Sequence, residues 1–162
     1  SCLKEPTMSG QYETRLAELG LALPEAAAPI ASYVPVVEAG GLMHVSGQLP
    51  FDAGQVVVGR CNGDADVDEG QKAAKLCALM VVAQLQKALG SLDRVARIVK
   101  LGVFVNSGAD FTAQPQVANG ASDLMEAVFG DAGKHARAAV GVSALPRGAM
   151  VEVDAVVAVH PA

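Results

Sequence analysis

A long helical pattern, DVDEGQKAAKLCALMVVAQLQKALG at residues 66–90, constrains the fold most strongly. Its apolar residues recur with the spacing of one helix face, and Gly90 is a typical C-terminal stop. Asp66 and Glu69 stand three positions apart and resemble a capping box. Cys77 lies on the apolar face, so we interpret it as a core thiol.

Strand patterns surround this helix. Residues 32–50 contain two short β-rich runs around a Gly-Gly turn, which predicts a hairpin. Residues 91–107 predict a long strand, and residues 115–129 predict a second helix with proline in its first turn. Residues 135–157 predict two further strands around the turn SALPRG. This turn is too short for a crossover connection, so we expect the two strands to pair antiparallel.

The order of these elements predicts one α+β domain, a single sheet with two helices packed on one face. A chain of 162 residues with 51% hydrophobic content is long enough for one core. We assign residues 31–162 to this domain and residues 1–30 to an N-terminal extension with a short helix at 11–20. Residues 1–7 precede a methionine, and the fold prediction does not depend on them. Valine and alanine at outward positions predict that oligomerisation covers the open sheet face.

Composition argues against several classes of protein. The net charge is −5, and the twelve Lys and Arg residues are scattered, which argues against nucleic-acid binding. No apolar run reaches the roughly 18–20 residues that a membrane span needs. No secretory signal is visible, so the cytoplasm is the expected compartment. Three cysteines at irregular spacing predict neither a disulfide framework nor a metal site.

Common catalytic motifs are missing from the sequence, which has no GxGxxG, Walker, GxSxG or HExxH pattern. His44, His135 and His160 lie far apart, and we interpret them as structural or exposed residues. Cys61 falls in a polar loop without a neighbour that would lower its pKa, so we interpret it as incidental.

Two opposite charges stand out in the apolar C-terminal stretch. The expected hairpin would bring Arg137 opposite the neighbourhood of Glu152 to Asp154. On a solvent-exposed sheet face, Arg137 and Glu152 would form a cross-strand ion pair that contributes up to about 1 kcal/mol to stability. If another subunit covers the face, the guanidinium could instead bind a carboxylate through two hydrogen bonds, with the glutamate activating a water. The residues alone leave both interpretations open.

From Tyr33 to its end the chain resembles the YjgF-type Rid family, the reactive intermediate deaminases once described as endoribonucleases. The resemblance rests on YV at 33–34, VSGQLP at 45–50, VKLGVFVN at 99–106 and HARAAVGVSALPRGAMVEVDAV at 135–156. The last motif is the most specific, because an Arg, a Leu-Pro turn and a VEV-like strand follow in the family's order and spacing.

The resemblance implies a chorismate-mutase-like fold that assembles as a homotrimer with a cleft at each subunit interface. Arg137 would bind the carboxylate of a 2-imino acid, and Glu152 would place the hydrolytic water. Tyr33, Ser46 and Gly47 would line the pocket. A 2-oxo acid and ammonia would leave, and the family needs neither a metal nor an organic cofactor.

Departures from the family pattern predict a divergent subgroup. Ser122 stands where family deaminases carry an asparagine, and Met125 stands where they carry an aromatic residue. Asn119 lies one turn earlier on the same helix face and can substitute for the asparagine. Ala139 replaces a thiol that many members carry. A second hypothesis is therefore a non-catalytic protein that binds a small carboxylate in the same cleft. An endoribonuclease is disfavoured by the acidic charge and the absence of a basic patch.

Overall fold

A computed structural model describes residues 10–162 of the chain. Residues 1–7, on which the fold prediction does not depend, lie outside the described residues, as do Met8 and Ser9. The helices and strands are α1 (Gln11–Glu18), β1 (Val36–Ala39), β2 (Leu42–Gln48), β3 (Phe51–Asp52), β4 (Gln55–Val56), α2 (Val67–Leu89), β5 (Val95–Asn106), α3 (Gln114–Phe129), β6 (Ala136–Val142) and β7 (Val151–Val159). The expected hairpin, long strand and helices are confirmed. No described helix is long and apolar enough to cross a membrane.

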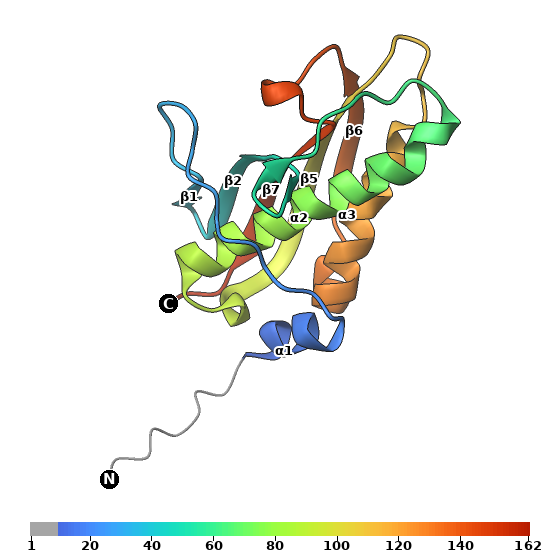
Figure 1. Ribbon diagram of the computed structural model, residues 1–162. Helices are drawn as coiled ribbons and strands as arrows, with labels where there is room; N and C mark the ends of the chain where they lie inside the picture. Colours follow the sequence, from blue (N-terminus) through green and yellow to red (C-terminus); the bar gives the residue numbers. More distant parts are fainter. Residues whose placement is uncertain (1–9) are drawn as a thin grey trace.

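The main sheet has five strands in the order β1-β2-β7-β5-β6, and β3 with β4 forms a separate two-stranded ribbon. The pair β5–β6 is parallel, whereas the other neighbours in the main sheet are antiparallel. Helices α2 and α3 lie side by side on one face of this sheet (Figure 1). The predicted α+β class, with two helices on one face of a sheet, is confirmed.

The predicted antiparallel pairing of the last two strands is wrong. Strand β5 lies between β6 and β7, so Arg137 and Glu152 are not on neighbouring strands. Helix α3 supplies the crossover that places β6 parallel to β5. The connection from β6 to β7 then crosses the end of β5. Asn106, at the end of β5, supports this connection by donating from Nδ2 to the Ala149 carbonyl oxygen at 3.2 Å. The connection is too short for a crossover, but it is long enough to span the one strand, β5, that lies between β6 and β7.

The start of α2 also differs from the prediction. Asp66 makes no side-chain cap to the helix. Its Oδ2 instead accepts hydrogen bonds from the backbone N–H groups of Asn62 (2.8 Å) and Gly63 (3.2 Å). Glu69 forms an exposed ion pair with Lys72. A 3-10 turn at Asp64–Asp66 precedes the helix and directs the aspartate backwards, so the expected capping box does not form.

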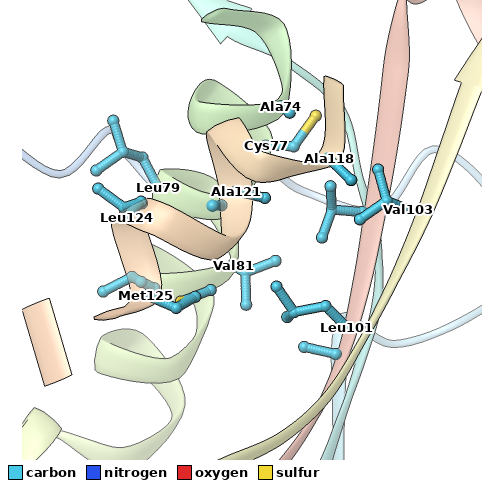
Figure 2. Close-up of a cluster of buried hydrophobic side chains, with 14 of the residues drawn as sticks. Ala74, Cys77, Leu79, Val81, Leu101, Val103, Ala118, Ala121, Leu124 and Met125 are labelled. Atoms are coloured by element: carbon cyan, nitrogen blue, oxygen red, sulfur yellow. The ribbon is translucent and has the colours of Figure 1, made fainter. Parts of the chain in front are cut away.

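The core lies between the two helices and the sheet. Figure 2 shows side chains of α2 and α3 facing each other, with Leu101 and Val103 of β5 beside them. Cys77 is fully buried in this cluster, as expected for a core thiol. Cys61 is buried as well, and burial raises the pKa of its thiol. The expectation of a polar loop around Cys61 is therefore wrong: an added Cβ at Gly70 of α2 would be 3.2 Å from its Sγ, so the start of α2 lies against the thiol.

The N-terminal helix α1 packs against the end of α3 and the turn before β5. The rings of Tyr12 and Phe129 meet edge to face at 4.7 Å. Glu13 accepts a hydrogen bond from the Leu92 N–H at 2.8 Å, and Leu16 is buried. Burial of apolar side chains thus joins the extension to the rest of the chain.

The two helices approach most closely at Gly120 of α3, where an added Cβ would collide with the backbone carbonyl of Gln71 in α2. We expect Gly120→Ala to lower the free energy of unfolding by about 1–3 kcal/mol through overpacking, despite alanine's better helix propensity of about 1 kcal/mol. Gly63→Ala, with nothing within 4 Å of the added methyl, should stay within about 0.5 kcal/mol. Urea unfolding measures both, and equal midpoints for the two variants would contradict the close approach.

Candidate functional site

A cavity of about 490 Å³ lies beside the start of β7 and brings together four of the predicted site residues. They are Tyr33, Ser46, Gly47 and Glu152, here called the glutamate pocket. The connector at 27–31 supplies much of the remaining, mostly apolar, wall. Such a volume suits a small metabolite held by a few polar groups.

An irregularity in β2 shapes this pocket. The register between β2 and β7 shifts between Val45 and Gln48, as in a β-bulge. Ser46 fixes the segment, since its hydroxyl donates to the Val34 carbonyl oxygen at 2.8 Å. Gly47 lies so close to Glu152 that an added Cβ would be 2.8 Å from the carboxylate carbon. The bulge and the glycine therefore make room for the carboxylate.

The Glu152 carboxylate is held in a partly buried setting. Burial, and secondarily the charge of Asp154, raises the pKa of Glu152 above its ordinary value. Burial likewise raises the pKa of Asp154, although the Gly102 N–H and the Lys100 charge oppose the shift. A carboxylate with a raised pKa is a stronger base, so Glu152 is suited to removing a proton from water.

These two raised pKa values predict how stability depends on pH. Carboxyls whose pKa is higher in the folded state stabilise the fold below their unfolded pKa, about 4, and lose that contribution as pH rises through the folded pKa. We expect Asp154→Asn to raise the thermal unfolding midpoint relative to wild type, by an amount that grows from pH 4 to pH 8. Calorimetry over this range measures the difference. A difference that stays constant with pH would contradict the assignment.

Arg137 lies on β6 and faces α3, where three hydrogen bonds hold its guanidinium. Its Nη1 donates to Asn119 Oδ1 at 2.9 Å and to Ser122 Oγ at 3.0 Å. Its Nη2 donates to the Pro115 carbonyl oxygen at 3.3 Å. The Nε–H and one Nη2–H have no acceptor within residues 10–162, and two such donors fit the two oxygens of a carboxylate. The expected grouping of Arg137, Asn119 and Ser122 is therefore present.

His135 joins this group, although the sequence pattern did not single it out as a site residue. Its Nε2 lies 2.8 Å from Ser122 Oγ, and its Nδ1 contacts the Gly133 carbonyl oxygen. We call Arg137, Asn119, Ser122 and His135 the arginine cluster. The signal that could have found His135 is its position two residues before Arg137, next to the start of β6, because residues two apart in an extended chain point to the same side.

Within one chain the two groups are separate. Arg137 pairs with Leu101, which faces the helices, whereas Glu152 alternates with buried residues and faces away from them. Two strand spacings and three residues of rise place their Cα atoms roughly 14 Å apart. The alternative of a cross-strand ion pair between Arg137 and Glu152 is therefore excluded, because Arg137 binds α3 instead.

The open sheet face carries exposed apolar side chains, as expected. Val37 on β1 is 49% exposed and Val140 on β6 is 46% exposed, and both point away from the helices. The described chain therefore leaves apolar surface uncovered on the side of the sheet that bears Glu152.

Comparison with known proteins explains this architecture. The YjgF/chorismate-mutase-like family model, whose description includes a provisional endoribonuclease label, matches residues 13–157. The chain belongs to this family. Protein TCP17 of Trypanosoma cruzi is 57% identical over 92% of this chain and 94% of its own length. A crystal structure of Agrobacterium tumefaciens protein Atu1372, of unknown function, has a TM-score of 0.85 and 46% identity, over 93% of this chain and 94% of that one.

A more distant relative of this YjgF-like chain carries an enzymatic name. The 2-iminobutanoate/2-iminopropanoate deaminase of Dermatophagoides farinae is 28% identical, over 86% of this chain and 95% of its own length. The predicted membership of the YjgF-type Rid family is thus confirmed.

Proposed function

We propose that this YjgF-like chain is a hydrolytic deaminase that converts small 2-imino acids into 2-oxo acids and ammonia. The observation that carries the proposal is the half-buried Glu152 carboxylate, set in a cavity of small-metabolite size beside Tyr33, Ser46 and Gly47. The family relationship and the deaminase among its relatives support the same chemistry.

Arg137 binds the substrate carboxylate in this proposal. Its three contacts to α3 hold the guanidinium in one orientation, so little side-chain entropy is lost when a ligand binds. The two remaining donors then form charge-assisted hydrogen bonds with the carboxylate. This interaction fixes the position of the neighbouring imine carbon.

Glu152 supplies the second element of the reaction. Its carboxylate takes a proton from a bound water, and the resulting hydroxyl attacks the imine carbon. Glu152 passes this proton to the nitrogen, which gives a carbinolamine. The carbinolamine hydroxyl then loses its own proton, which reaches the amino group through Glu152, the carbon–nitrogen bond breaks, and ammonia leaves with the 2-oxo acid. An imine carbon is already electrophilic, so orienting the substrate and placing one water are sufficient.

The complete site needs two copies of the chain, since Arg137 and Glu152 face opposite sides of one sheet. We propose a homotrimer in which the arginine cluster of one copy lies against the glutamate pocket of the next. The uncovered apolar face with Val37 and Val140 supplies surface for such contacts. The ligand would lie at the junction between subunits.

Imine clearance tests this proposal. An amino-acid oxidase generates 2-iminopropanoate and bulkier 2-imino acids in situ, and semicarbazide traps the imine that remains. The wild-type protein should lower the trapped imine for at least one substrate, and the series will report the size limit of the pocket. Trapped imine equal to that in buffer for every substrate would overturn the proposal.

A non-catalytic carboxylate-binding protein remains the second candidate. Ser122 replaces the family's asparagine and is hydrogen-bonded to His135, so the arginine cluster differs from that of the deaminases. In that case a 2-oxo acid such as pyruvate should raise the thermal unfolding midpoint in a saturable way, without imine clearance.

A further inference from the structure

Ser122 lies in the middle of α3, but its hydroxyl is not used by the helix in the usual way. A serine inside a helix commonly donates to the carbonyl oxygen four residues earlier. Here Ser122 Oγ lies 2.8 Å from His135 Nε2 and accepts a hydrogen bond from Arg137 Nη1 at 3.0 Å. The hydroxyl is therefore directed out of the helix, toward a histidine and a cation.

The histidine is oriented by a second contact. His135 Nδ1 faces the Gly133 carbonyl oxygen, which can only accept a hydrogen bond. The neutral ring therefore carries its proton on Nδ1 and leaves Nε2 free to accept the serine proton. A nucleophile within hydrogen-bond reach of a base, with the base held by a third group, is the arrangement of an activated serine.

Donors for a developing negative charge lie beside the hydroxyl. The Arg137 guanidinium donates to Ser122 Oγ itself, which favours the alkoxide. Asn119 lies one helical turn before Ser122 and is exposed; its Oδ1 is engaged by Arg137, which leaves its Nδ2 group for a ligand oxygen. Ser122, His135 and Arg137 are only partly buried, so solvent molecules can reach them.

We propose that Ser122 is a nucleophile activated by His135, and that it forms a covalent acyl-enzyme with small activated acyl esters. Ser122 Oγ bonds to the acyl carbon while His135 takes the hydroxyl proton. The tetrahedral intermediate then expels the alcohol, which receives that proton from His135. A water, deprotonated by His135, next attacks the ester and releases the acid, and the proton returns to Ser122.

The remaining Arg137 donors suggest the substrate class. An acyl chain that ends in a carboxylate can bind them while its ester carbonyl lies at Ser122, so half-esters of short dicarboxylic acids fit the arginine cluster. This activity does not rest on the proposed imine chemistry, because it uses neither Glu152 nor a second copy of the chain.

Covalent labelling with a fluorophosphonate tests the proposal. Ser122 attacks phosphorus, fluoride leaves, and His135 accepts the hydroxyl proton. Mass spectrometry of the intact wild-type protein and its peptides should show one adduct, on Ser122. His135→Gln keeps a hydrogen-bond acceptor for the serine but cannot take up its proton, so the labelling rate should fall about 100-fold or more. Ser143→Ala, at an exposed serine outside the cluster, should label like wild type.

Ester turnover is the second readout. Wild type should hydrolyse the p-nitrophenyl half-ester of succinic acid faster than p-nitrophenyl acetate, and Ser122→Ala should reduce both rates to that of buffer. Wild-type adducts spread over exposed serines, or equal labelling of wild type and His135→Gln, would show that the Ser122–His135 hydrogen bond only joins α3 to the segment before β6. The position of the adduct on the wild-type protein tests whether Ser122 is the nucleophile, even if a variant fails to fold.

Discussion

Replacing Arg137 with alanine should reduce kcat/KM for 2-imino acids by roughly 10²- to 10⁴-fold, because two charge-assisted hydrogen bonds contribute about 1.5–3 kcal/mol each. The substrate carboxylate would lose its only proposed cationic partner, and the imine carbon would no longer be held near the water. Initial rates of imine clearance across substrate concentrations measure this loss.

The matched control is Arg137→Lys, which retains the positive charge but not the planar arrangement of donors. We expect it to recover stability more fully than activity, because a lysine can still reach acceptors on α3 while binding a carboxylate through a single point charge. If Arg137→Ala kept more than half of the wild-type kcat/KM, the arginine would be a structural residue that joins β6 to α3.

Glu152→Gln should lower kcat by roughly 10²- to 10⁴-fold with a small change in KM, as expected for loss of a general base that does not contact the substrate carboxylate. The amide has nearly the same shape as the carboxylate and fits beside Gly47. It also removes a partly buried charge and its repulsion with Asp154. The thermal unfolding midpoint at pH 7 should therefore stay the same or rise.

The control for this variant is Asp154→Asn, two residues further along β7. It relieves the same repulsion but lies outside the glutamate pocket, so it should keep most of the activity. Comparable activity losses in the two variants would show that activity depends on the negative charge of this sheet face, and that Glu152 is not the base.

Local patterns predicted most of the elements and the β1–β2 hairpin, but not the pairing of the last two strands. The long helix, the second helix and the long strand β5 each have a strong period of their own, so they could be predicted individually. The partner of β6 could not, because it depends on the α3 crossover that brings β6 parallel to β5. A short turn between two strands suggests a hairpin only when neither edge is already taken by a third strand.

Local patterns also predicted only part of the candidate site. Arg137 and Glu152 were predicted from the family's motif, but their positions on opposite faces follow from β5 lying between β6 and β7. His135 lies thirteen residues from Ser122, across the end of α3, and no helical or strand period links the two. Cys61 was expected in a polar loop because its neighbours are polar, whereas the start of α2 lies against its thiol and the residue is buried.

Mixing two inactive variants tests the central claim, that one site is built from two copies of the chain. Arg137→Ala and Glu152→Gln are unfolded together at equal concentration, refolded and assayed for imine clearance beside wild type. A cyclic assembly that pairs the arginine cluster of one copy with the glutamate pocket of the next will regain about one quarter of the wild-type activity. Half of the copies carry an intact Arg137 and half carry an intact Glu152, so about one junction in four holds both. A mixture no more active than the two variants refolded separately, beside an active wild type, would contradict the shared site.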